Sequence, residues 1–108
     1  MDLTLNVYKD NGKDVEKTLK ATTYDLMFGT VVQLMDLLSI EDIENKMEML
    51  KVIYKAWKEI TVVLSGVFPD ATEDDWKHVK VKELLPVILD IAKFSVSEML
   101  TIPVDEKN

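Results

Sequence analysis

The chain has 108 residues, which suits one compact domain, and 47% of them are apolar, which is enough for a core. It has no cysteine, so disulfides and thiolate metal sites are excluded. The net charge is −7 and every base is lysine, which argues against nucleic acid and anionic membrane as partners.

The chain carries no visible targeting or membrane signal. Its first residues lack the basic and apolar regions of a signal peptide. The most apolar stretch, residues 60–68, is much shorter than the ~18 residues that span a membrane. We therefore expect a cytoplasmic protein.

The first twenty residues predict a β-hairpin. Leu3, Leu5 and Val7 alternate with other residues at the period of a half-buried strand, and the turn falls at residues 10–12. A lone hairpin is marginally stable in water. Its apolar face is therefore expected to pack against the rest of the chain.

Two turn lengths give this hairpin different registers. A two-residue turn would put Val15 and Leu19 on the face opposite Leu3 and Val7. A three-residue loop with Gly12 in the left-handed conformation pairs Val7 with Val15 and Leu3 with Leu19, which gathers the apolar residues on one face. We predict the three-residue loop.

Helices are predicted for most of the remaining chain. Residues 24–38 have helical spacing, with Thr22 or Thr23 as the cap. Ser39 begins a capping signal for a second helix that extends as far as Val67. Its apolar residues step by three or four: Ile43, Met47, Leu50, Tyr54, Trp57, Thr61 and Leu64.

The last part of the chain predicts a short helix and a long one. Thr72 and Asp75 form a cap for a short helix around Trp76, and the final helix begins near Val81. Pro86 lies close to its start, where a missing amide is best tolerated. The sequence thus predicts a mainly α fold, an N-terminal β-hairpin followed by a bundle of about three to four helices. We expect one domain over residues 1–102 and a frayed tail over 103–108.

No residue set for catalysis, cofactors or metals is recognisable. His78 is the one histidine, and Asp74 and Asp75 lie near it without a nucleophile or a glycine-rich loop. The acidic residues from 70 to 75 lack the spacing of a calcium loop, and helix N-terminal charge explains them better. We therefore expect a protein that is not an enzyme.

The apolar arcs of the first and last helices are more informative. A helix with one buried side needs an apolar arc of little more than ~100°, and both of these arcs are wider. A neighbouring element can account for one wide arc. Two wide arcs in a short chain suggest a surface that a partner or another copy completes.

Several segments together resemble the small tail assembly chaperones of long-tailed phages and prophages of low-GC Gram-positive bacteria. The likeness lies in the layout, a hairpin followed by helices, and covers all but the last few residues. It is carried by the runs Tyr24-Asp25-Leu26-Met27-Phe28-Gly29, Lys55-Ala56-Trp57, Val67-Phe68-Pro69-Asp70-Ala71-Thr72 and Val81-Lys82-Glu83-Leu84-Leu85-Pro86.

The resemblance implies a function. Such chaperones bind the long, largely helical tape measure protein, keep it soluble, help deliver tail tube protein to it, and leave before the tail is complete. The family offers no catalytic residues to transfer. On physical grounds we expect an apolar partner-binding surface made by five residues of the first and last helices: Met27, Leu34, Val87, Ile91 and Phe94.

Two other classes remain open at this point. A small acidic adaptor, anti-repressor or antitoxin would bind a folded, basic partner one to one. An enzyme with an unrecognised site would show a cleft with a strongly shifted carboxylate or histidine pKa.

Overall fold

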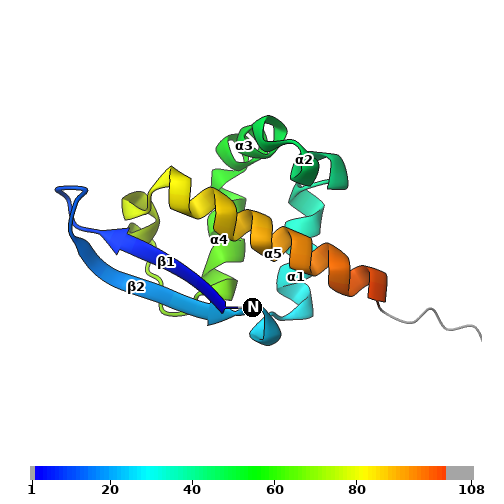
Figure 1. Ribbon diagram of the computed structural model, residues 1–108, viewed down its shortest axis with the longest axis horizontal. Helices are drawn as coiled ribbons and strands as arrows, with labels where there is room; N and C mark the ends of the chain where they lie inside the picture. The colour runs from blue at the N-terminus through cyan, green and yellow to red at the C-terminus, as the bar shows by residue number, and fades with distance from the viewer. Residues whose placement is uncertain (1, 102–108) are drawn as a thin grey trace, which may run out of the picture.

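The computed structural model describes residues 2–101, and the expected tail over 103–108 lies outside them. Figure 1 shows a hairpin beside a group of helices, with the long last helix running across them. The predicted fold class, mainly α with an N-terminal hairpin, is confirmed. In chain order the elements, where η marks a 3-10 helix, are β1 (Asp2–Tyr8), β2 (Val15–Thr22), η1 (Thr23–Asp25), α1 (Phe28–Leu37), α2 (Ile40–Glu44), α3 (Lys46–Lys55), α4 (Trp57–Val67), η2 (Asp74–His78) and α5 (Val81–Thr101).

The hairpin has one buried face, as its alternation predicts. Leu3, Leu5 and Val7 of β1 and Leu19 of β2 all belong to the core. This face is covered because β1 packs against α5 and η2. The isolated hairpin would be marginal, so the helices supply most of its stability.

The predicted hairpin register is wrong by two residues. Leu3 lies opposite Ala21, and Leu19 lies opposite Leu5. Side chains alternate with a period of two, so a shift of two leaves Leu3, Leu5, Val7 and Leu19 on their predicted face. The prediction of the apolar face is therefore correct, although the predicted pairs of residues across the two strands are not.

The cause of the shift is a longer loop. Lys9 N–H donates to the Asp14 carbonyl at 2.8 Å, which closes a loop over residues 10–13. The Asn11 side chain accepts from the backbone N–H groups of Lys13 and Asp14, and Gly12 is left-handed, as predicted, with φ of 69°. Side-chain bonds from asparagine favour such turns.

A β-bulge then changes the position of Val15. The register shifts between Val7 and Tyr8, so that Val15 lies opposite Tyr8 and not opposite Val7. The extra residue in β2 rotates Val15 away from the core. Val15 is exposed as a result.

The first predicted helix is shorter than expected. Thr22 caps η1, where its side chain accepts from Tyr24 N–H, but Leu26 and Met27 are extended. Helix α1 then begins at Phe28 without a side-chain cap. Leu26 packs against the core, while Tyr24 and Phe28 are exposed.

The second predicted helix is three helices. Ser39 forms the predicted capping box with Asp42 at the start of α2. The chain then leaves the helical conformation at Asn45, whose side chain accepts from Met47 and Glu48 N–H at 3.0 and 3.3 Å. Asparagine at this position offers the backbone an alternative to the continuing helix. A second break at Ala56 separates α3 from α4.

The last described elements, α4, η2 and α5, begin and end close to the predicted positions. Helix α4 ends at Val67, Thr72 and Asp75 exchange hydrogen bonds at the start of η2, and α5 begins at Val81. Pro86 is tolerated within the first two turns of α5, where it removes one helical N–H donor. Within the described part of the chain, no helix combines the length and the apolar character that crossing a membrane requires.

Candidate functional site

The five residues predicted to bind a partner do not form one surface. Leu34, Val87 and Ile91 are core residues with exposed fractions of 2%, 7% and 1%. Met27 is 72% exposed in the extended segment before α1, and Phe94 is half-buried on α5. The predicted surface is therefore corrected, because most of its residues are covered by the protein itself.

The wide apolar arc of α5 has an internal explanation. Helix α5 contacts β1, α1 and α2, and these elements cover it from several sides. A helix that packs against several neighbours needs a wide apolar arc. The residues that it contributes to the core include Leu84, Val87, Ile88, Ile91 and Ala92.

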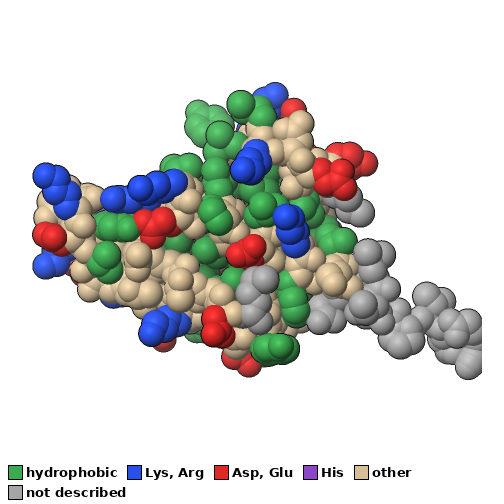
Figure 2. Space-filling model, viewed as in Figure 1, with side chains coloured by type: hydrophobic (Ala, Val, Ile, Leu, Met, Phe, Trp, Pro, Cys, Tyr) green, Lys and Arg blue, Asp and Glu red, His purple; other side chains and the backbone are tan. Residues whose placement is uncertain are grey.

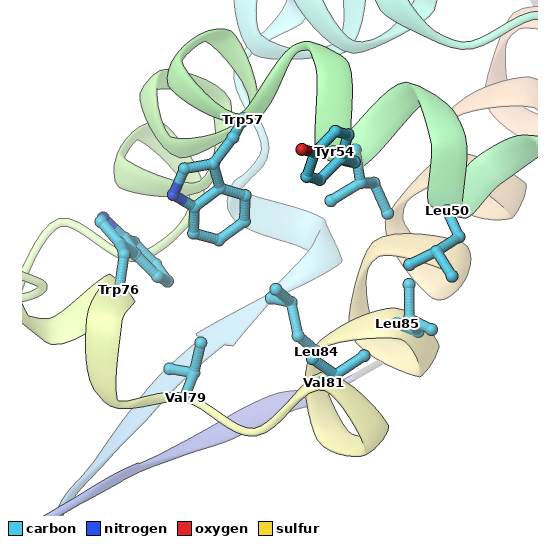
Figure 3. A pocket seen from close by; sticks show the side chains of 9 residues that line it. Leu50, Tyr54, Trp57, Trp76, Val79, Val81, Leu84 and Leu85 are labelled. Atoms are coloured by element: carbon cyan, nitrogen blue, oxygen red, sulfur yellow. The ribbon is translucent and has the colours of Figure 1, made fainter.

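An apolar groove of about 410 Å³ opens elsewhere, between α3 and the start of α5 (Figure 3). One wall consists of Leu50, Ile53 and Tyr54 of α3 and Trp57 of α4. The facing wall comes from η2, the residues after it and the start of α5: Trp76, Val79, Val81, Leu84 and Leu85.

The groove has a buried floor and an exposed rim. Figure 3 shows Trp57 and Trp76 toward one end, while Leu50 and Leu85 lie near each other at the opposite end. Trp76 is buried in the floor, whereas Tyr54 on the rim is 84% exposed. Apolar surface left in water in this way is stabilised when another apolar surface covers it.

The η2 wall is held rigidly to the rest of the fold. Asp75 accepts from Thr72 N–H at 2.7 Å and lies 2.5 Å from the Lys17 ammonium on β2. Burial disfavours its charged form, but the hydrogen bonds from Lys17 and Thr72 prevail and lower the pKa of Asp75. The next residue, Trp76, donates from its indole N–H to the Ser65 hydroxyl at 3.2 Å.

The α3 wall depends on the break at Asn45. In one continuous helix, Leu50, Tyr54 and Trp57 would lie on the same buried stripe as Ile43. The break instead buries Met49 and Ile53 and leaves Leu50 and Tyr54 at the groove. Sequence reasoning missed the groove for this reason, and the signal that could have revealed it is an asparagine within the predicted helix.

A second hollow of about 310 Å³ adjoins the groove, and Leu85 lines both. Its other residues mix lysine with apolar side chains: Lys46, Met49, Lys82, Pro86 and Leu89. On the face seen in Figure 2, lysine side chains lie on either side of the hydrophobic surface near α3 and the start of α5. The two hollows together extend the apolar surface along α5.

His78 lies beside the hairpin loop. Its Nε2 is 2.8 Å from Asp10 Oδ1, and its Nδ1 is 3.1 Å from the Asp74 carbonyl oxygen. Both partners accept hydrogen bonds and so favour the protonated ring. The Asp74 carbonyl has the larger effect and the Asp10 carboxylate the smaller one, and together they raise the pKa of His78 although burial lowers it. The contact between His78 of η2 and Asp10 of the hairpin loop connects these two parts of the fold.

Tyr8 connects the same hairpin to α5. Its hydroxyl donates to Glu83, which also accepts from the Asn6 side chain at 3.2 Å, and the Lys80 ammonium lies 4.2 Å from the centre of its ring. The hydrogen bond to Glu83 and burial raise the pKa of Tyr8. These contacts fix the start of α5, and with it one wall of the groove.

Within residues 2–101, no three histidine or carboxylate side chains lie together in a group that could hold a metal ion. Comparisons with protein-family models, curated proteins and solved structures find no match. The groove between α3 and the start of α5 combines exposed apolar side chains, Leu50, Tyr54 and Val81, with the buried Trp76.

Proposed function

We propose that this chain is a non-enzymatic chaperone of phage tail assembly whose apolar groove accepts amphipathic helices of the tape measure protein. The observation that carries the proposal is the groove itself, lined by apolar and aromatic side chains and open to solvent at Tyr54 and Val81. Grooves of this kind bind helices through an apolar stripe. The sequence resemblance supplies the identity of the partner.

The residues proposed to bind the partner are those of the groove rather than those first expected. Leu50, Tyr54 and Trp57 lie on α3 and α4 with access to solvent, whereas Leu34 and Ile91 have none. Fully covering a large apolar side chain contributes roughly 1.5–3 kcal/mol. A few such anchors would suffice for reversible binding, which suits a chaperone that leaves the finished tail.

The surface charge suits the same role. A net charge of −7 favours solubility and opposes aggregation of a complex with an apolar helical polymer. In the proposed role, several copies bind along one tape measure chain in the bacterial host cytoplasm and help bring tail tube protein to it. Contacts between neighbouring copies would then form a homo-oligomer on the polymer.

Co-expression with the tape measure protein tests the proposal. The chain should move that protein from the insoluble to the soluble fraction. The variant Leu50→Asp/Tyr54→Asp should lose this effect while keeping its helical circular dichroism. Met47→Asp is the matched control, because Met47 is exposed on the same helix but does not line the groove.

Stoichiometry separates the proposal from its alternative. A chaperone of a long polymer loads many copies on each partner chain, whereas an acidic adaptor, anti-repressor or antitoxin forms a one-to-one complex with a folded partner. Mass measurement by light scattering on the purified complex distinguishes the two. A one-to-one complex, or solubilisation that survives the double variant, would contradict the proposal.

A further inference from the structure

Two lysines continue the walls of the groove. On α3, Lys46, Leu50 and Tyr54 follow one another at intervals of four residues, so they lie in one row along the helix. On α5, Lys82 and Leu85 are three residues apart and share a face in the same way. Both lysines line the second hollow, which meets the groove at Leu85.

These lysines have no carboxylate partner within the described part of the chain. The ion pairs that lysines form there join Lys17 to Asp75 and Lys51 to Glu48, and neither Lys46 nor Lys82 takes part. The acidic residue next to Lys82, Glu83, accepts from Tyr8 and Asn6 instead. Two lysine side chains that form no ion pair among the described residues therefore line an apolar hollow on a protein whose net charge is −7.

We propose that the groove selects amphipathic helices that carry an acidic residue beside the apolar stripe, with the carboxylate held between Lys46 and Lys82. The inference rests on the proposed function, since it requires that the groove bind a helix. The stripe covers Leu50, Tyr54 and Leu85, and the carboxylate follows about one helical turn further along, ~5.4 Å away. Charge complementarity of this kind gives specificity more than raw affinity.

The net charge of the chain predicts the opposite preference. A protein of charge −7 attracts basic peptides and repels acidic ones at long range. At 0.15 M salt the Debye length is about 8 Å, so contacts within the groove dominate over the distant charges. If the groove prefers the acidic peptide at this ionic strength, the two lysines and not the net charge of the whole surface cause the preference.

Two synthetic peptides test the inference on the full chain. They share one leucine stripe and carry either glutamate or lysine at the positions flanking it. Trp57 and Trp76 are the two tryptophans of the chain and both line the groove, so tryptophan emission reports binding directly. We expect the glutamate peptide to bind roughly threefold to tenfold more tightly, the effect of two exposed ion pairs. The preference should shrink in 1 M salt.

Charge reversal identifies the lysines responsible. In Lys46→Glu/Lys82→Glu the order of the two peptides should invert. Both positions lie in the first turn of a helix, where an acidic residue is well tolerated, so the variant should fold. Lys13→Glu/Lys93→Glu changes the net charge equally at exposed positions outside both hollows and should keep the original order.

The outcomes separate this inference from the proposed function. Equal affinity for both peptides, each abolished by Leu50→Asp, would overturn the charge selection and leave helix binding in place. No binding of either peptide would overturn both. A tryptophan emission shift that depends on protein concentration and not on peptide would show that a second copy of the chain occupies the groove. If Lys13→Glu/Lys93→Glu also inverted the order of the two peptides, the preference would come from the long-range charge of the protein. Each of these results would overturn the inference.

Discussion

Lys17 of β2 and Asp75 of η2 form an ion pair at 2.5 Å that joins the hairpin to the wall of the groove. Asp75 also completes the capping box with Thr72. One buried carboxylate thus fixes both the start of a helical turn and its position on the sheet. The site depends on this contact because Trp76, the next residue, lies in the groove floor.

Removal of the Asp75 carboxylate should therefore destabilise the fold. Asp75→Ala loses the cap to Thr72 and the pair with Lys17, at a cost of about 1–3 kcal/mol in the free energy of unfolding. Urea denaturation followed by circular dichroism measures the change. Glu73→Ala, an exposed neighbour on the same turn, should change stability by less than ~0.5 kcal/mol. Equal losses in the two variants would contradict the role assigned to Asp75.

The same carboxylate predicts an acid dependence. The folded pKa of Asp75 lies below its ordinary value of 3.8, so the folded state binds the proton less readily than the unfolded chain does. Its contribution to stability is fully present above pH 3.8 and is lost as the pH falls through the lower folded value. Asp75→Asn should flatten this part of the stability profile, measured by denaturation between pH 5 and pH 2.

His78 predicts a dependence in the opposite direction. Its folded pKa lies above its ordinary value of 6.5, because the Asp74 carbonyl and the Asp10 carboxylate hold the proton. The contribution to stability is present below pH 6.5 and is lost as the pH rises through the higher folded value. The chain has one histidine, so its ring signals in an NMR titration give this pKa directly. Asp10→Asn should lower it, and an unchanged value would argue against the contact.

Two glycines should respond oppositely to alanine. Gly12 has φ of 69° in the hairpin loop, where a Cβ is strained, so Gly12→Ala should destabilise by about 1 kcal/mol. Gly29 lies in the first turn of α1 with nothing within 4 Å of an added Cβ. Gly29→Ala should stabilise by roughly 0.5 kcal/mol through helix propensity. Thermal unfolding of the two variants side by side checks both signs.

Aspartate substitutions should distinguish the core of α5 from the groove. Ile91 is 1% exposed, so Ile91→Asp buries a charge without a partner and should cost more than ~4 kcal/mol, with loss of helical circular dichroism. Tyr54→Asp should leave the spectrum and the unfolding midpoint almost unchanged, since its side chain lies in solvent. A folded Ile91→Asp variant would show that α5 is packed less tightly than the structure indicates.

Local signals of the sequence were sufficient for most elements. The alternation of Leu3, Leu5 and Val7 identifies the inner face of the hairpin, and the caps at Ser39 and Thr72 place two helix starts correctly. Each depends on bonds or side-chain directions within a few residues. The hairpin register was missed because Asn11 adds its own bonds to the loop, which the apolar pattern does not report.

The candidate site was less predictable from the sequence. A wide apolar arc on a helix has the same pattern whether its own domain or a partner covers it. Val87 and Ile91 were therefore assigned to a surface, although the structure buries them in the core. Tyr54 was assigned to a buried stripe, although the break at Asn45 exposes it.

By itself, the sequence determined the acidic, lysine-only charge, the absence of cysteine, the fold class and the hairpin face, because composition and short-range periodicity are properties of the chain alone. The tertiary structure decided which apolar residues remain in water. That outcome depends on which elements surround each helix: α5 packs against β1, α1 and α2, whereas α3 packs mainly against its chain neighbours α2 and α4. The groove exists because Trp76 of η2, far in sequence from Leu50 and Tyr54 of α3, meets them only after these elements pack.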